Sequence, residues 1–387
     1  MLSTGMNVID LGLVPTPVFY FAMDLFKNDH GVMITASHLP KEFNGFKINK
    51  GLWSLTYTTG INKIESLTKR YHKTNHKPKI TRMDFVDKYY KFILPKIRIR
   101  DQLKVAVDGG NGVAGEFLVK ALKKLGCKVL SLYCKPDGNF SNHVPNPLIN
   151  STLKDLQSLI RKNKVDIGLA VDGDGDRIRV VSPNGQILEN EVIISLLAKY
   201  LLLKQPYSNI VYSSICSDLV KFEVRKYKGY PIMEKVGHSF MKNTSIKKNA
   251  ILSGEYAGHI GFKDVNYNDD GIYAGLKLCE LLSKHPGFWN EAKQLSTLFF
   301  APPELRLKVK ENSKKIIMKH FNNKFKMYKT SKKDGLRIFF SSISWALIRP
   351  SNTESVISLR FQAKNKSELK LISNLILKEL KMAQKKT

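Results

Sequence analysis

The chain has 387 residues, of which 43% are hydrophobic and 10% aromatic, and this balance excludes a disordered protein. At roughly 100 to 200 residues per domain, we expect two to four domains that each bury a core. The net charge of +30 would suit a nucleic-acid partner, but the lysines are spread through most of the chain without an aromatic stacking platform. We therefore interpret the charge as a solvated surface and keep nucleic-acid binding as the less favoured alternative.

Cysteine usage and apolar patterning predict a cytoplasmic protein. The four cysteines lie far apart without a C-x-x-C pair, which argues against a zinc site or a disulfide framework. The first 26 residues contain no Lys or Arg, so no charged segment precedes an apolar one as in a secretion signal. The longest apolar runs are too short or too interrupted to span a bilayer, and we expect no membrane partner.

Apolar runs and helical spacings alternate through residues 1–300 in a pattern typical of parallel α/β units. Strands are expected at residues 8–11, 32–34, 103–107, 128–133, 167–171, 210–213 and near 251. Helices are expected at residues 19–26, 83–92, 117–125, 153–160, 219–227 and 273–282. We divide this part into three α/β domains with mixed sheets, at residues 1–100, 101–198 and 199–300.

Residues 301–387 begin at a Pro-Pro pair and are predicted to form a smaller α+β domain. Strands are expected at residues 305–309, 336–340, 346–348 and 356–361. A helix capped by Ser367 follows, because Leu369, Ile372, Ile376 and Leu380 share one face.

Ser37 follows a short apolar strand and lies in the stretch TASHLP, which runs on to NGFK. Ligands of open α/β sheets bind outside the carboxyl ends of strands, so a hydroxyl there is a candidate nucleophile or phosphate carrier. The alternative is a serine that only holds a turn through local backbone hydrogen bonds.

The glycine-rich turn Gly110-x-Gly112-x-x-Gly115 follows a strand and opens a helix, as in dinucleotide-binding folds. That fingerprint also needs an acidic residue at the end of the next strand, where this chain has Cys134 and Lys135. We therefore favour a turn used for packing, and an NAD-dependent oxidoreductase is the alternative.

Asp172, Asp174 and Asp176 alternate with glycines directly after a buried strand, so their carboxylates can converge on one point. Three hard oxygen ligands suit Mg²⁺, which keeps other positions for water or phosphate. Without a cation, carboxylates so close would repel one another. The loop is a candidate magnesium site, and an acidic turn capped by its own backbone is the alternative.

Two later loops carry further polar groups. Glu255 and His259, in GEYAGH, suit metal ligation, acid–base chemistry or hydroxyl recognition. The loop RPSNTE places the guanidinium of Arg349 and several hydroxyls between two strands, which suits a phosphate group; a polar hairpin is the alternative.

In this order, the motifs resemble those of the α-D-phosphohexomutases, most closely the bacterial phosphomannomutase/phosphoglucomutase branch. The resemblance covers nearly the whole chain and rests on TASHLPKEFNGFK, DGGNGVAG, HVPNP, DGDGDR, KVGHSFMK, GEYAGH, DDGIYAG and RPSNTES. It implies four domains around a central cleft. It also implies a monomeric, Mg²⁺-dependent isomerase that interconverts hexose 6-phosphate and hexose 1-phosphate through a phosphoserine and a hexose bisphosphate.

The resemblance implies a role for each matching residue. Ser37 would carry the phosphoryl group with Arg177 beside it, and Lys47 and His238 would be the acid–base candidates. The metal ligands would be Ser37, Asp172, Asp174 and Asp176. The substrate-binding residues would be Glu255, Ala257, His259, Arg349, Ser351, Asn352 and Thr353. The glycine turn of the second domain would be structural.

Three departures from the family pattern bear on activity. Family chains begin earlier, with a strand and a loop that reaches the active site, so we expect a first domain without part of its sheet. A truncated, inactive homologue is therefore the alternative function. Ala257 stands where a serine is common, and Glu354-Ser355 replaces a more usual proline ending. GEYAGH is nearest to the GEMSGH form of the mannose and glucose enzymes, which favours those sugars.

Overall fold

A five-stranded sheet forms where the sequence has its most continuous apolar runs. The computed structural model describes residues 5–26, 30–68, 77–100, 102–351 and 354–385. In this second domain the sheet order is β10-β9-β8-β6-β7. Its strands are β6 (Lys104–Asp108), β7 (Lys128–Leu132), β8 (Ile167–Val171), β9 (Ile178–Val181) and β10 (Ile187–Leu188). Strands β6, β7 and β8 are parallel, and β8, buried throughout, ends directly before Asp172.

Helices cover both faces of this sheet. On one face, α5 (Lys154–Asn163) packs Leu156 and Ile160 against Ala106 and Ala170. On the other, α4 (Ala114–Lys124) contacts α9 (Gly271–Lys284) of the third domain. A Cβ on Gly275 would lie 3.4 Å from Leu118, so the two helices approach closely there.

The third domain repeats the arrangement with a four-stranded sheet in the order β12-β11-β13-β14. Its strands are β11 (Asn209–Ser213), β12 (Tyr230–Glu234), β13 (Leu252–Gly254) and β14 (Ile260–Phe262). Its further helices are α6 (Asn190–Leu202), α7 (Asp218–Lys226), α8 (His238–Lys248) and α10 (Phe288–Ser296). The expected domain boundary at residues 198 and 199 falls inside α6, which is buried on nearly all sides.

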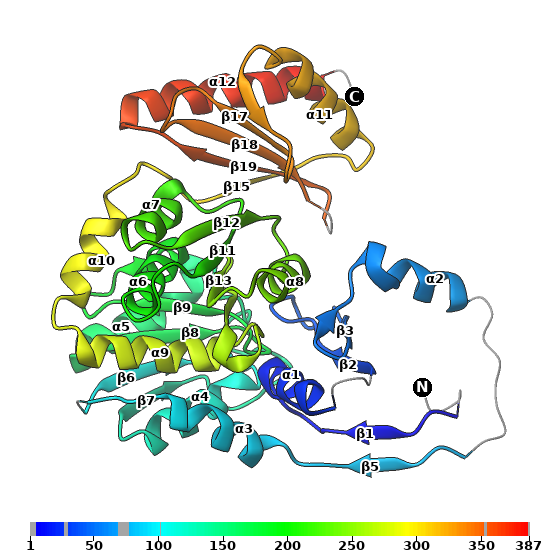
Figure 1. Cartoon of the computed structure of the whole chain (residues 1–387), viewed down its shortest axis with the longest axis vertical. Coiled ribbons are helices and arrows are strands. Elements are labelled where there is room, and N and C mark those ends of the chain that lie inside the picture. The colour runs from blue at the N-terminus through cyan, green and yellow to red at the C-terminus, as the bar shows by residue number, and fades with distance from the viewer. Residues whose placement is uncertain (1–4, 27–29, 69–76, 101, 352–353, 386–387) are drawn as a thin grey trace.

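The first domain has two small sheets. Strand β1 (Val8–Asp10) pairs in parallel with β5 (Ile80–Arg82), while β2 (His30–Ile34), β3 (Phe46–Lys50) and β4 (Trp53–Ser54) are antiparallel. Its helices are α1 (Thr16–Leu25), α2 (Asn62–Thr68) and α3 (Val86–Ile93). Figure 1 shows α1 between the small sheets and the second and third domains, which agrees with the burial of most of its residues.

The fourth domain is an antiparallel sheet in the order β15-β19-β18-β17-β16, with two helices on one face (Figure 1). Its elements are β15 (Leu305–Lys308), α11 (Ser313–Lys324), β16 (Lys329–Ser331), β17 (Leu336–Phe339), β18 (Trp345–Pro350), β19 (Val356–Gln362) and α12 (Lys366–Gln384). The predicted cap of α12 is wrong. Asn365, not Ser367, caps the helix by accepting from the amide of Glu368 at 2.9 Å.

The fold therefore confirms three α/β domains followed by a smaller α+β domain. Among the described residues, no helix is both long and apolar enough to cross a membrane.

Candidate functional site

The Ser37 loop of the first domain lies directly against the acidic loop of the second. The Ser37 hydroxyl donates to Asp172 Oδ2 at 2.9 Å, and the Ser37 amide donates to Thr35 Oγ1 at 2.9 Å. A Cβ on Gly173 would lie only 2.4 Å from the carbonyl oxygen of Ser37, so a glycine is needed for this approach. Ser37 itself has φ 57°, a conformation that non-glycine residues seldom adopt. The unusual backbone conformation of Ser37 and its close approach to Gly173 thus bring the Ser37 hydroxyl within hydrogen-bond distance of the Asp172 carboxylate.

The three aspartates converge as the sequence predicts. Their ligand atoms lie within 4.8 Å of one another, and all three side chains are buried. Asp172 Oδ1 accepts from the amides of Gly175 at 3.0 Å and Arg177 at 3.1 Å, which fixes its orientation. Asp174 Oδ1 is buried and has no hydrogen-bond partner among the described residues. An unsatisfied buried carboxylate oxygen beside two others fits a divalent cation.

Lys47 brings a positive charge to the acidic loop from the first domain. Its Nζ donates to Asp174 Oδ2 at 2.7 Å and also to Asp176 Oδ2. Asp174 Oδ2 accepts from the hydroxyls of Thr16 at 2.7 Å and Thr35 at 3.0 Å as well. Three side chains of the first domain therefore hold Asp174, in addition to the bond from Ser37 to Asp172.

Charge and burial give the aspartates different protonation preferences. Burial, followed by repulsion from Asp176 and Asp174, raises the pKa of Asp172 to about 8. Burial also disfavours ionised Asp176, but Lys47 and then His259 outweigh it and hold the pKa of Asp176 well below its usual value. Burial favours neutral Lys47, but Asp174 and Asp176 outweigh it and hold the pKa of Lys47 well above its usual value. A cation beside Asp172 would therefore favour its ionised form at neutral pH.

The GEYAGH loop of the third domain joins the same cluster. His259 Nε2 lies 3.4 Å from Asp176 Oδ1, and His259 Nδ1 lies 3.2 Å from Glu255 Oε1. Burial favours the neutral imidazole, but Asp176 outweighs it and raises the pKa of His259 to about 10. His259 also forms an isolated antiparallel β-bridge with Arg177. Ala257, half-buried in this loop, presents only a methyl group.

His238 begins α8 and faces α1 of the first domain. Its Nδ1 lies 3.4 Å from the hydroxyl of Tyr20, and its Nε2 lies 3.0 Å from the hydroxyl of Ser239. Burial, reinforced by the charge of Lys47, lowers the pKa of His238 to about 3. The two acid–base candidates therefore differ at neutral pH, since His238 is a neutral acceptor and Lys47 a charged donor.

Several residues of the cluster were not predicted as site residues. They are Thr16, Tyr20, Thr35, His38 and Asp269. His38 Nδ1 lies 3.3 Å from Ser37 Oγ, and Asp269 forms a second potential metal-binding group with Glu255 and His259. Thr35 and His38 belong to the motif TASHLP, and Asp269 belongs to DDGIYAG. Membership in these motifs could have indicated that the three residues lie in the site. Thr16 and Tyr20 lie in α1, outside all the motifs, so no motif indicated that they lie in the site.

The predicted phosphate loop lies in the fourth domain, between β18 and β19. Arg349, at the end of β18, is buried; its Nη2 lies 3.6 Å from Glu304 Oε1, and its Nε has no hydrogen-bond partner among the described residues. Lys314 Nζ donates to the carbonyl of Ser351 at 2.8 Å. Asn352 and Thr353 lie outside the described residues. The guanidinium thus keeps an unused donor, which suits an anionic ligand.

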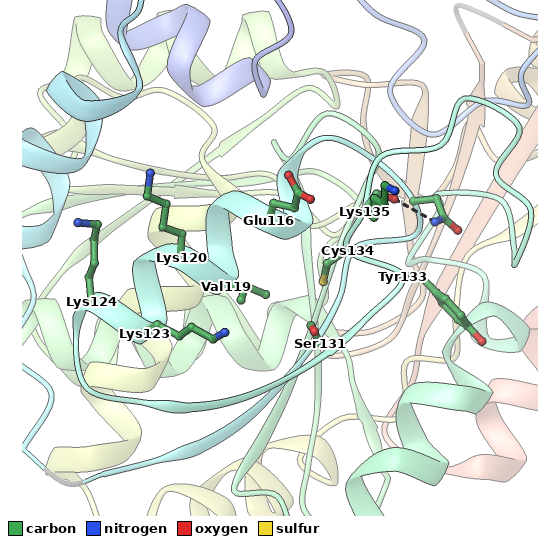
Figure 2. Close-up of a pocket in the computed structure, with 10 residues that line it drawn as sticks. Glu116, Val119, Lys120, Lys123, Lys124, Ser131, Tyr133, Cys134 and Lys135 are labelled. Carbon is green, nitrogen blue, oxygen red and sulfur yellow. Dashed lines mark hydrogen bonds between the residues drawn. The ribbon is translucent and has the colours of Figure 1, made fainter.

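A hollow of about 800 Å³ lies on the second domain, between α4 and the residues after β7 (Figure 2). The side chains that line it are Asn111, Glu116, Val119, Lys120, Lys123, Lys124, Ser131, Tyr133, Cys134 and Lys135. It contains no predicted site residue, and its lysines are exposed. The adjoining glycine turn is closely packed: a Cβ on Gly112 would lie 2.5 Å from Gly173 Cα. That contact supports the packing interpretation of the turn over dinucleotide binding.

Comparison with known proteins matches nearly the whole chain to one family. Four models for phosphoglucomutase/phosphomannomutase match in order: alpha/beta/alpha domain I at residues 1–75, domain II at 84–185, domain III at 189–303 and the C-terminal domain at 304–379.

Curated relatives and a solved structure agree. A phosphomannomutase/phosphoglucomutase of Pseudomonas syringae is 36% identical over 382 residues, which are 98% of this chain and 82% of the relative. A phosphoglucomutase of Neisseria gonorrhoeae is 33% identical over 383 residues, 97% of this chain and 82% of the relative. A crystal structure of a phosphoglucomutase/phosphomannomutase family protein from Burkholderia thailandensis is 33% identical, with a TM-score of 0.87 over 99% of this chain and 84% of that chain. The chain therefore belongs to the phosphoglucomutase/phosphomannomutase family.

Proposed function

We propose that this chain interconverts hexose 6-phosphate and hexose 1-phosphate, of mannose or glucose, with Ser37 as the phosphoryl carrier. The observation that carries the proposal is the 2.9 Å hydrogen bond from the Ser37 hydroxyl to Asp172 within a buried triad of carboxylates. The relatives named phosphomannomutase and phosphoglucomutase support the two sugars. The buried Oδ1 of Asp174 has no hydrogen-bond partner among the described residues, which supports the binding of a metal ion there. We propose Mg²⁺ because it prefers hard oxygen ligands.

Asp172, Asp174 and Asp176 would hold the cation together with an oxygen of phosphorylated Ser37. When bound, Mg²⁺ neutralises the charge that develops on the transferring phosphoryl group. Ser37 begins the cycle phosphorylated. The free hydroxyl of the sugar phosphate attacks phosphorus, the bond from phosphorus to Ser37 Oγ breaks, and a sugar bisphosphate forms. Ser37 Oγ then attacks the other phosphorus of that sugar, and the bond from this phosphorus to the sugar oxygen breaks. Ser37 is phosphorylated again and the sugar keeps one phosphate, so no phosphate is gained or lost.

Each transfer needs one proton taken up and one supplied. His238 would accept the proton of the attacking sugar hydroxyl, since burial leaves its imidazole unprotonated. Lys47, which is charged at neutral pH, would supply a proton toward the Ser37 oxygen as it leaves. In the reverse transfer the roles exchange, as microscopic reversibility requires.

The remaining candidates would bind the substrate. Glu255 and His259 lie in the loop next to the three aspartates and would contact sugar hydroxyls. Ala257, between them in the sequence, would make an apolar contact with the sugar. Arg349, with Ser351, Asn352 and Thr353, would bind the phosphate that does not react. Arg177 would stabilise the transferring group from beside Asp172, whose Oδ2 lies 3.6 Å from Arg177 Nε.

The test is conversion of sugar phosphates followed by phosphorus NMR. Mannose, glucose and glucosamine 6-phosphates are each mixed with the purified chain, Mg²⁺ and a trace of the matching bisphosphate. We expect 1-phosphates of mannose or glucose to form, and Ser37→Ala to lower turnover at least about 1,000-fold. Ser141→Ala, at an exposed serine, is the control and should be unchanged. Unchanged turnover in Ser37→Ala, or no conversion of any of the three sugars, would overturn the proposal.

A further inference from the structure

The turn between β16 and β17 reaches from the fourth domain to the third. Figure 1 shows the sheet of the fourth domain beside β11 and β12. In this turn Lys333 Nζ donates to the carbonyl of Met233 and lies 3.4 Å from Glu234 Oε2 at the end of β12. The turn therefore meets the third domain at the carboxyl end of β12, directly before the segment KVGH.

Asp334 binds this segment through one carboxylate oxygen. Its Oδ2 accepts from the backbone amide of Val236 at 3.0 Å and from the hydroxyl of Ser214 at 2.5 Å. Ser214 follows β11 and Val236 follows β12, so a single oxygen bridges the exits of two neighbouring strands. Hydrogen bonds to a charged acceptor are shorter and stronger than neutral ones.

The next amide in the segment is held by another carboxylate. Gly237 N donates to Glu255 Oε2 at 3.0 Å. Gly237 has φ 130°, which L side chains rarely adopt, and His238 follows it as the first residue of α8. Two consecutive amides before His238 are thus fixed by carboxylates from two different domains.

We propose that Asp334 is a positioning residue, which couples the docking of the fourth domain to the placement of Gly237 and His238. Asp334 touches neither metal ligands nor the reacting atoms. It acts by restricting the backbone that leads into α8, so His238 is aligned when the fourth domain is seated. The consequence for turnover rests on the proposed mutase function, whereas the restriction of the backbone does not.

The same interface offers a matched control. Asp218, at the start of α7, also bridges the third and fourth domains, since its Oδ2 accepts from Trp345 Nε1 at 3.2 Å and Gln362 Nε2 at 3.1 Å. None of its described hydrogen bonds goes to the segment KVGH. Asp218→Ala therefore removes two hydrogen bonds of the same interface but leaves the bond from Val236 to Asp334 in place.

The experiment compares Asp334→Ala, Asp334→Asn and Asp218→Ala in the full chain. The rate of amide hydrogen exchange in a peptide spanning residues 234–238 measures how firmly this backbone is held. The constants kcat and KM measure the effect on the reaction. For Asp334→Ala we expect exchange about 10-fold faster and kcat about 10-fold lower, with KM changed less than about threefold. Asp334→Asn keeps a neutral acceptor, so both effects should shrink to about threefold. Asp218→Ala should leave exchange of this peptide as in the unmodified chain.

Two results would overturn the proposal. One is unchanged exchange at residues 234–238 in both Asp334 variants. The other is equal acceleration in Asp218→Ala, because the effect would then come from docking alone. If the unmodified chain converts no sugar phosphate, the proposed function fails, and the exchange comparison still decides whether Asp334 holds the segment. If Asp334→Ala does not fold, the intermediate change expected for Asp334→Asn carries the test.

Discussion

The Ser37 loop and the Arg349 loop both suit a phosphate group, but the protein supports them in different ways. Ser37 lies where two domains interlock, with Thr16, Thr35 and Lys47 all bound to Asp174. Arg349 pairs with Glu304 of its own domain. The proposed reacting centre thus depends on contacts between two domains, whereas the proposed phosphate-binding arginine is paired within one domain.

After Ser37→Ala, the largest expected effect is at the carboxylates that contact the Ser37 loop. Asp174→Ala removes a proposed metal ligand and the acceptor of three cross-domain hydrogen bonds, so we expect turnover to fall at least about 100-fold. Removing divalent cations with a chelator should abolish activity in the unmodified chain, and added Mg²⁺ should restore it. Asp137→Asn, on an exposed turn of the second domain, is the control. Full activity in Asp174→Ala, or after chelation, would contradict the metal site.

Lys47→Met should lower stability as well as activity. The change leaves Asp174 and Asp176 buried without their lysine, and breaking a buried ion pair costs about 3 kcal/mol. We expect the free energy of unfolding in urea to fall by about that amount. Mg²⁺ should recover part of the stability but not the activity, because the proton donor is missing. If the variant and the unmodified chain are equally stable when both are measured without Mg²⁺, the lysine does not compensate the negative charge of these carboxylates.

Arg349→Lys tests the other side of the comparison. Lysine keeps the charge but not the fork of donors, so binding of the unreactive phosphate should weaken. We expect KM for the sugar phosphate to rise about 10-fold with kcat changed less than about threefold. Steady-state kinetics provides the measurement. A loss confined to kcat would place Arg349 in the reacting centre and remove the distinction between the two loops.

The smallest expected effect is Ala257→Ser. It adds a hydroxyl to the sugar loop, and one neutral hydrogen bond is worth about 1 kcal/mol, or roughly a fivefold change. We expect a lower KM for one hexose phosphate relative to the other, read from parallel kinetics with mannose and glucose phosphates. Identical ratios in both proteins would mean that residue 257 does not contact the sugar.

The strands at the centre of the fold could be predicted because their apolar runs are continuous. Residues 167–171 were predicted with the bounds that β8 has. Five helices were missed, namely α2, α6, α8, α10 and α11. Two of them were missed for opposite reasons. Helix α6 is apolar on nearly all sides and has no periodic face, whereas α8 carries mainly polar residues and little helical spacing. The cap of α12 was misplaced because Asn365 and Ser367 are both good capping residues.

In the site, the convergence of the three aspartates could be predicted because they alternate with glycines within one short loop. Their convergence therefore depends on local sequence alone. The salt bridges of Lys47 to Asp174 and Asp176 join residues far apart in the chain and depend on how two domains dock. The contrast between protonated Lys47 and neutral His238 depends on burial and neighbouring charge, which no motif encodes. Asp334 likewise acquires its contacts only when the fourth domain is in place.

The most direct test of the account is the phosphorylation state of Ser37. The purified chain is incubated with a hexose bisphosphate and Mg²⁺, and its intact mass and phosphopeptides are measured. We predict one added phosphoryl group, located on Ser37 and lost when excess hexose 6-phosphate is added. A chain without phosphate, or with the phosphate on another residue and transferred from there, would contradict the assignment of Ser37 as the phosphoryl carrier.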